Sequence, residues 1–204
     1  MGSRIESLRG ILFNAADVPK LRALRNQQVG DLAGTGLEVG VGTGNNLPHY
    51  AANVHRLVVL DAAAGMRRQA RSRVDRARMP VQWVRGWAED LPFADASFDF
   101  VVSTLLLCGA CDPAKVISEV CRVLKPGGQY RFLEHGCHRS APVAAWQKRL
   151  DPLQRLVAGC ELTRDVAGLI ADSQLTVQTM WTREVFGGLG KLFPLTGGVA
   201  VRAM

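Results

Sequence analysis

The sequence lacks long apolar runs and a regular cysteine pattern. Its longest nearly apolar stretch, residues 100–111, is about half of the roughly 20 residues that a transmembrane helix needs. The five cysteines are odd in number and irregularly spaced, unlike the paired framework of a small secreted domain. Only residues 11–13 form an apolar run after Arg4 and Arg9, so a signal peptide is not expected. The sequence therefore predicts a cytoplasmic chain with reduced cysteines and no transmembrane segment.

Acidic residues are scarce relative to basic ones, 18 against 25, which gives a formal net charge of +7. Twenty of the basic residues are arginine, and six of these lie within residues 67–78. Apolar residues recur between them at helical spacing: Met66, Ala70, Val74 and Ala77. The pattern favours an amphipathic helix whose arginines face water, with a patch for nucleic acid or another anionic surface as the alternative. No specific nucleic-acid partner is expected.

The remaining composition indicates one packed domain. The chain has 204 residues, of which 48% are hydrophobic and 21% charged, close to the average for a soluble globule. This length can bury a self-sufficient core. We find no internal repeat, low-complexity tract or linker, and we expect a single domain over residues 4–204. Nothing in the sequence predicts the oligomeric state.

From Gly36 onward, short apolar runs alternate with helical patterns. The runs predict strands at residues 37–40, 56–61, 81–86, 98–104, 129–134, 175–181 and 198–203. The helical patterns lie at residues 45–51, 65–78 and 113–124. This alternation predicts an α/β fold, a Rossmann-like, doubly wound sheet of seven strands, mostly parallel. Only a loop at 187–197 separates the last two strands, so they are expected to form an antiparallel hairpin.

Two segments lie outside this rhythm. Residues 4–33 look helical in two pieces that are separated near Pro19, and we expect them to form a lid. Residues 138–172 look mostly helical and form an insertion before the sixth strand. Residues 36–134 between them would form the cofactor-binding core.

The loop after the first predicted strand contains Gly40, Gly42 and Gly44. Glycines here let the backbone turn sharply and approach a ligand closely. A dinucleotide fingerprint needs its third glycine where Asn45 stands, and the Gly-Lys-Ser/Thr of a phosphate loop is absent. Glu38 suits a pyrophosphate poorly, but it can attract an ammonium or organise the loop. A helix N-terminus beyond the glycines can receive a carboxylate.

The second predicted strand ends in an acid, Asp61, seventeen residues after Gly44. An acid at this position is placed to accept hydrogen bonds from ribose hydroxyls. The ligand indicated by the glycine loop and this acid has a ribose and an amino acid and requires no phosphate. These features describe S-adenosylmethionine.

Five motifs in order resemble those of the class I S-adenosylmethionine-dependent methyltransferases. They are Glu-Val-Gly-Val-Gly-Thr-Gly at 38–44, Asp61, Ala-Glu-Asp-Leu-Pro-Phe at 88–93, Ser-Phe-Asp at 97–99 and Val-Leu-Lys-Pro-Gly-Gly at 123–128. The resemblance covers nearly all of residues 36–134 and implies methyl transfer with S-adenosylhomocysteine as product. The cofactor-binding positions that it implies are Glu38, Gly40, Gly42, Thr43, Gly44, Asn45, Asn46, Asp61, Ala62, Met66, Trp87, Ala88, Glu89, Thr104 and Leu105.

One position departs from that pattern. Many relatives have aspartate before the Ala-Glu pair to receive the adenine amino group, whereas this sequence has Trp87. Adenine recognition would then rest on the backbone near Ala88 and Glu89, or on packing against an aromatic face. The alternative is that Trp87 belongs to the core.

The end of the fourth predicted strand, residues 104–108, is almost wholly apolar. It lacks the Asn/Asp-Pro-Pro-aromatic signature of enzymes that methylate amino groups of nucleic acids and proteins. An apolar wall suits a small, hydrophobic acceptor. We therefore expect a small-molecule acceptor.

A narrower resemblance extends into the insertion. This sequence resembles the animal alkyl-thiol methyltransferases of the methyltransferase-like seven group and their bacterial relatives. The similar segments are residues 104–108, 119–124, 132–135, 146–147, 150–152 and 159–164. Those animal enzymes carry a membrane-anchoring N-terminal segment, which we do not expect in this chain. Residues 45–48 also resemble bacterial phospholipid and quinone methyltransferases. The expected reaction is S-methylation of a thiol. O- or N-methylation of a lipid, quinone or secondary metabolite is the alternative, and a non-catalytic cofactor-binding module is a third possibility.

His135, at the end of the fifth predicted strand, is the catalytic candidate. An imidazole with an ordinary pKa of about 6.5 can accept a proton from a thiol, while a histidine bonded to backbone is the structural alternative. Cys108 and Cys111, with Cys137, His135 and His138 expected at the neighbouring strand end, would offer a metal or redox site. Structural zinc usually needs two spaced ligand pairs, and the sequence has a single Cys-x-x-Cys. We predict no metal and ordinary buried thiols.

Overall fold

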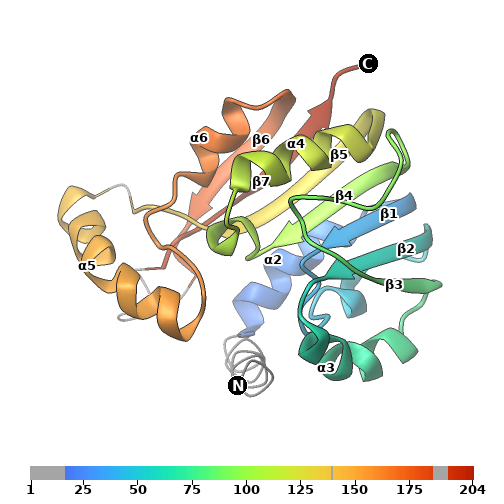
Figure 1. The fold of residues 1–204 in the computed structure, drawn as a ribbon, viewed down its shortest axis with the longest axis horizontal. Coiled ribbons are helices and arrows are strands. Elements are labelled where there is room, and N and C mark those ends of the chain that lie inside the picture. The colour runs from blue at the N-terminus through green and yellow to red at the C-terminus, as the bar shows by residue number, and fades with distance from the viewer. Residues whose placement is uncertain (1–16, 139, 186–192) are drawn as a thin grey trace.

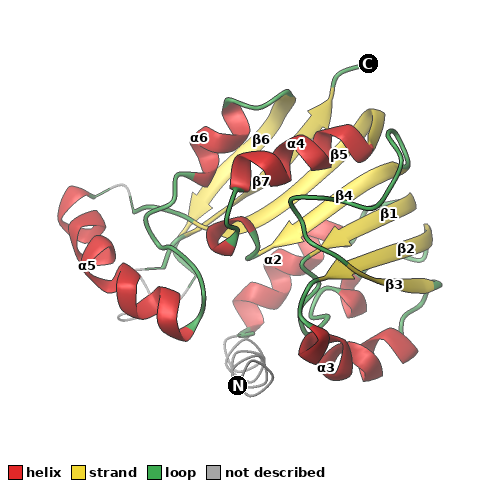
Figure 2. Cartoon of the chain, in the orientation of Figure 1, coloured by secondary structure: helices red, strands yellow, loops and turns green. Residues whose placement is uncertain are grey.

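The computed structural model describes residues 17–138, 140–185 and 193–204. These residues form one sheet with helices on both faces (Figures 1 and 2). The seven strands are β1 (Gly34–Val39), β2 (Val54–Asp61), β3 (Val81–Arg85), β4 (Phe98–Thr104), β5 (Leu124–His135), β6 (Leu175–Arg183) and β7 (Leu195–Arg202). The predicted doubly wound α/β fold is confirmed.

The strand order across the sheet is β3-β2-β1-β4-β5-β7-β6. β1 pairs in parallel with both β2 and β4, whereas β7 runs antiparallel to β5 and β6. The expected C-terminal hairpin is therefore confirmed. The strand order reverses direction at β1 and β4, and in such sheets a ligand crevice opens beyond the carboxyl ends of those strands.

The helices divide between the two faces of the sheet. They are α2 (Pro19–Val29), α3 (Ala64–Asp75), α4 (Pro113–Val123), α5 (Ala141–Val157) and α6 (Val166–Ala171), with short 3-10 turns η1 (Leu47–His49) and η2 (Leu107–Gly109). Alternate residues of β2 point to opposite faces, so Val58 packs with the cluster under α4 and α6, and Val59 with the cluster that includes Val29 of α2. Figure 1 shows α4 and α6 in front of the sheet and α2 behind it.

The described part of the predicted lid is α2. It begins at Pro19, whose fixed φ suits the first turn of a helix. Its buried Leu21 and Leu24 pack with Leu133 of β5, which anchors the helix beside the carboxyl ends of the central strands. The first predicted piece of the lid, up to residue 16, lies outside the described residues.

The predicted helix over residues 45–51 is wrong, because this segment forms only the single turn η1. Tyr50 returns to extended backbone with φ −64° and ψ 140°, and its hydroxyl is held by the buried carboxylate of Glu38. The side chain of Asn46 is bonded to the same carboxylate. These bonds fix both ends of the turn, and the extended backbone at Tyr50 ends it.

The described part of the insertion contains α5 and α6 joined by a loop that lies against η2. Arg164 donates hydrogen bonds of 2.7 and 2.6 Å to the backbone oxygens of Leu107 and Ala110. The backbone N–H of Glu161 donates to the backbone oxygen of Cys108 at 2.8 Å. The insertion is thereby fixed to the end of the sheet where the site lies. Among the described residues, no helix is both long and apolar enough to cross a bilayer.

Candidate cofactor and acceptor site

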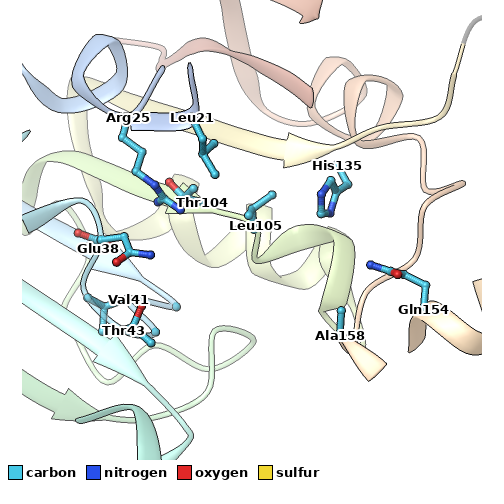
Figure 3. Close-up of a pocket in the computed structure, with 13 residues that line it drawn as sticks. Leu21, Arg25, Glu38, Val41, Thr43, Thr104, Leu105, His135, Gln154 and Ala158 are labelled. Carbon is cyan, nitrogen blue, oxygen red and sulfur yellow. The ribbon is translucent and has the colours of Figure 1, made fainter. Parts of the chain in front are cut away.

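A pocket of about 200 Å³ opens beyond the carboxyl ends of β1, β4 and β5 (Figure 3). We call it the central pocket. Its walls include α2, the glycine loop, the end of β4 and the C-terminal part of α5. The predicted site residues that line it are Glu38, Gly40, Gly42, Thr43, Asn45, Thr104, Leu105 and His135.

A second cavity of about 170 Å³ lies beyond β2 and β3 and shares Gly40 with the central pocket. The predicted residues that line it are Asp61, Ala62, Trp87, Ala88 and Glu89. The implied cofactor positions therefore divide between two adjoining cavities. Gly44, Asn46 and Met66, which the sequence also implied, line neither of these cavities.

The three glycines of the loop have different steric reasons to be glycine. All have positive φ, with +69° at Gly40, +54° at Gly42 and +78° at Gly44. A Cβ on Gly40 would lie 2.7 Å from the side chain of Leu106, and one on Gly44 would lie 2.9 Å from that of Leu47. A Cβ on Gly42 would meet only a backbone oxygen at 4.0 Å, so it would project into the open central pocket. This bare backbone fits the close approach of a cofactor.

Glu38 organises the loop from beneath. The Tyr50 hydroxyl donates to its Oε2 at 2.8 Å, and Asn46 Nδ2 donates to its Oε1 at 3.0 Å. Burial raises the pKa of Glu38 to about 7, although these hydrogen bonds and the charge of Arg25 oppose the shift. Of the two predicted roles, the described contacts show the loop-organising one.

Arg25 of α2 is a functional candidate that sequence reasoning missed. Its guanidinium is buried, lines the central pocket, and donates to Asn46 Oδ1 at 2.8 Å and to Asp17 Oδ1 at 2.9 Å. Figure 3 shows it pointing toward Glu38 and Thr104. The same Asn46 amide also donates to Thr104 Oγ1 at 3.0 Å, so it connects the lid to β1 and β4. Nothing in the spacing around Arg25 distinguishes it from a solvated helix cation.

The second cavity places Trp87 at its rim with 68% of the side chain exposed, so the interpretation of this residue as core is wrong. Glu89 lies beside it and accepts a hydrogen bond from the backbone of Cys111. An exposed indole next to an open cavity is available to cover a planar ring.

The arginine-rich segment is a solvated helix face, as expected. Most of its arginines are exposed on α3 or just beyond it. Arg73 differs, because it is half-buried and donates to the backbone oxygen of Thr43 at 2.9 Å. It therefore supports the glycine loop.

Glu134, near the end of β5, holds the backbone of the turn that follows β4 at the pocket wall. Its fully buried carboxylate accepts hydrogen bonds from the backbone of Leu106 and Cys108 and from Ser103 Oγ. Burial raises its pKa, and the backbone donors oppose that shift. These bonds fix the turn that follows Leu105, a non-glycine residue with φ +56° whose side chain faces the pocket.

His135 and Gln154 point toward one another at the far end of the central pocket (Figure 3). His135 Nδ1 lies 3.9 Å from Cys108 Sγ and 3.8 Å from Cys160 Sγ. The ring thus lies near two thiols, and it also meets the ring of Phe193 edge to face, with 6.1 Å between the centroids. The predicted neighbours Cys111 and Cys137 are instead exposed, and Cys160 takes their place.

Comparisons with known proteins agree with this geometry. The family model described as a methyltransferase domain matches residues 37–132. The chain is 33% identical over 165 residues to the thiol S-methyltransferase TMT1B of Rattus norvegicus, covering 76% of this chain and 67% of that protein. It is 38% identical over 118 residues to the phosphatidylethanolamine N-methyltransferase of Cereibacter sphaeroides, covering 56% of this chain and 57% of that protein.

A solved S-adenosylmethionine-dependent methyltransferase from Methanosarcina mazei shares the fold. The TM-score is 0.66 at 20% identity, over 83% of this chain and 92% of that one. The fold, the glycine loop and the relatives all indicate the same family. This chain is an enzyme that belongs to the class I S-adenosylmethionine-dependent methyltransferases.

Proposed function

We propose that this methyltransferase methylates the sulfur of a small thiol. The observation that supports the proposal is the composition of the pocket's far end. Leu105 and Ala158 provide apolar surface, and the polar side chains of His135 and Gln154 converge there. Such an end fits an acceptor with an apolar body and one ionisable head. The relative named as a thiol S-methyltransferase supports the same chemistry.

The two cavities bind different parts of S-adenosylmethionine, whose sulfonium supplies an activated methyl group. Arg25 presents a cation at the central pocket, where a carboxylate can bind. Glu38 holds the glycine loop in shape through Tyr50 and Asn46, and Gly42 leaves its bare backbone toward the ligand. Asp61 and Trp87 line the second cavity, where we propose that ribose and adenine bind.

Beyond binding the cofactor, the protein must orient the acceptor and assist its deprotonation. Methyl transfer needs the acceptor sulfur in line with the methyl carbon, which the apolar wall can provide by orientation. A thiol with a pKa near 8.5 must also lose its proton, because the thiolate is the nucleophile. We propose that His135 assists that loss. The carbon–sulfur bond then forms as the sulfonium bond breaks, with its electron pair staying on the leaving sulfur.

The alternative acceptor is a nitrogen or oxygen of a lipid or quinone. The phospholipid N-methyltransferase relative is the observation that favours it. We propose that the insertion decides between these acceptors. An acceptor comparison separates the two.

The test is a matched acceptor series with the purified chain. An alkyl thiol, alcohol and amine of one carbon skeleton are incubated with S-adenosylmethionine, together with a quinol and phosphatidylethanolamine in micelles. Released S-adenosylhomocysteine and the methylated product are measured by mass spectrometry. The thiol should be methylated at least tenfold faster than the others. Faster methylation of the quinol or the lipid contradicts the proposal, and so does cofactor binding without product from the thiol.

A further inference from the structure

Three side chains with nitrogen or sulfur donor atoms meet beneath the far end of the central pocket. Cys108 comes from η2, His135 from the end of β5, and Cys160 from the loop between α5 and α6. Their donor atoms all lie within 4.8 Å of one another. The two cysteines are buried, and His135 is half-buried with its ring at the pocket wall.

The separations are close to those of a tetrahedral zinc site. With Zn–S of about 2.3 Å and Zn–N of about 2.0–2.1 Å, tetrahedral geometry sets the donor atoms roughly 3.5–3.8 Å apart. His135 Nδ1 lies 3.9 Å from Cys108 Sγ and 3.8 Å from Cys160 Sγ. Each sulfur is therefore within a few tenths of an ångström of the separation from Nδ1 that a shared zinc ion needs. Two thiolates and one imidazole are ligands that zinc favours.

The protein holds the three ligands in place through separate contacts. The loop that carries Cys160 is fixed to η2 by the hydrogen bonds of Arg164 and by the backbone bond from Glu161 to Cys108. A Cβ on Gly109 would lie 2.7 Å from the backbone oxygen of Gly159, so glycine is needed for this close approach. The cluster is thus preorganised by contacts that do not involve its donor atoms.

The side of the cluster that faces the pocket is where a further metal ligand could bind. Gln154, which lines the pocket with His135, has Nε2 3.3 Å from Cys160 Sγ. A ligand that displaced this amide would reach the cluster from the acceptor side. Three protein ligands with one position left for substrate are typical of catalytic zinc.

We propose that Cys108, His135 and Cys160 bind one zinc ion whose fourth position faces the acceptor end of the central pocket. The ion would neutralise two buried thiolates, which explains why two cysteines and a histidine converge in a buried place. The sequence expectation of no metal rested on Cys108 and Cys111 and did not include Cys160.

The site has a consequence for the acceptor, and this consequence rests on the proposed function. A substrate thiol that coordinates zinc gives its proton to solvent and remains a nucleophilic thiolate. Its sulfur bonds the methyl carbon, and the sulfonium bond breaks with its electron pair staying on the leaving sulfur. The neutral thioether formed is a weaker ligand than a thiolate and leaves. His135 then assists deprotonation as a ligand of the ion.

Metal binding tests the site without an activity assay. The chain is stripped with a chelator in reducing buffer and titrated with Co²⁺ and then with Zn²⁺. We expect one zinc per chain by elemental analysis. We also expect a thiolate-to-cobalt charge-transfer band, and the intense visible bands of a four-coordinate ion. Less than one zinc per chain, or a cobalt spectrum without thiolate bands, overturns the proposal.

Variants assign the ligands. Cys108→Ser, Cys160→Ser and His135→Ala should each weaken zinc binding at least about 100-fold, since even residues that only orient ligands cost 10- to 100-fold. The matched controls are Cys121→Ala, a buried thiol on α4, and Cys137→Ser, an exposed one. Both should keep the full stoichiometry and spectrum. Calorimetry with S-adenosylmethionine checks that each variant is folded, and a full cobalt spectrum in Cys160→Ser would overturn the proposal.

The site and the proposed function can fail separately. If one zinc binds but no thiol is methylated, the site stands and the thiol assignment falls. If the metal-free chain methylates thiols at the full rate, the thiol assignment stands and the role of zinc in acceptor binding falls. A change in the cobalt visible bands on addition of 2-mercaptoethanol would support direct coordination of the acceptor.

Discussion

The backbone N–H of Gly42 donates a 2.8 Å hydrogen bond to Oδ2 of Asp61. The other carboxylate oxygen accepts from the backbone of Ala63, one residue before α3 begins. The acid at the end of β2 therefore holds the middle of the glycine loop and the start of the next helix together. We expect cofactor affinity to depend on both residues through this link.

Gly42→Val should abolish cofactor binding while the chain still folds. The new side chain would occupy the pocket, since a Cβ at this position meets only open space. The matched control is Gly127→Val, because Gly127 also has positive φ, +75°, with nothing within 4 Å of its Cβ, and it lines neither cavity. Both variants carry similar backbone strain of about 1–2 kcal/mol. Calorimetry should show loss of binding only in Gly42→Val, and retained micromolar affinity would refute the loop assignment.

Asp61→Ala should weaken cofactor affinity by about 1.5–3 kcal/mol, as expected for loss of a charged hydrogen-bond acceptor. The loss has two sources, the freed glycine loop and the proposed bond to ribose. Asp99 is a suitable control, because it accepts from Thr35 N and pairs with Lys125 at the other end of the sheet. Asp99→Ala should reduce stability without changing the calorimetric dissociation constant. An unchanged constant in Asp61→Ala would show that this acid has no part in binding.

Arg25→Met should weaken binding of S-adenosylmethionine by at least tenfold. The buried guanidinium is placed to meet the carboxylate of the cofactor, and the variant keeps much of the apolar stem. Decarboxylated S-adenosylmethionine provides the decisive comparison, because its affinity should hardly differ between wild type and variant. Arg22→Met, at an exposed arginine that pairs with the same Asp17, is the control and should bind both ligands normally. Equal losses for the two ligands would indicate that Arg25 only supports the loop.

Glu38 should make the folded state less stable as pH rises toward 7. Burial raises its pKa to about 7 from 4.5, so the folded chain holds a proton that the unfolded chain has lost between these values. The contribution is fully present below pH 4.5 and is lost as pH rises through 7, by an amount on the order of 3 kcal/mol. Denaturant unfolding of wild type and Glu38→Gln across pH 4.5–8 measures it. A difference between the two chains that stays constant with pH would contradict this assignment.

His135→Ala should lower the methylation rate most for alkyl thiols of high pKa and least for acidic aryl thiols. Aryl thiols ionise unaided and need no help with their proton. The pH profile of the variant should follow the ionisation of the acceptor. His55→Ala, at an exposed histidine of β2, is the control. An equal loss across a series of thiols of graded pKa would mean that His135 is structural.

The sequence by itself predicted the parts that depend on local pattern. The apolar runs placed all seven strands. The signal is clearest for central strands such as β4, because strands buried on both faces need continuous apolar residues. The glycine loop and Asp61 could be found because a tight turn and a strand end sit at fixed places in a parallel sheet. The cofactor followed from those two features. The predicted helix over 45–51 failed because the bonds of Tyr50 and Asn46 to Glu38 are tertiary contacts without a local signal.

Only the tertiary structure showed which distant residues meet. Cys108 and Cys160 are separated by one strand and two helices, and no periodicity relates them, yet the bonds of Arg164 bring their loops together. Arg25 looks like any surface cation of a helix until α2 packs against β5 and buries it. Side-chain chemistry and local spacing can be read directly from the sequence. The distance between two loops cannot, because it depends on how the elements between them pack.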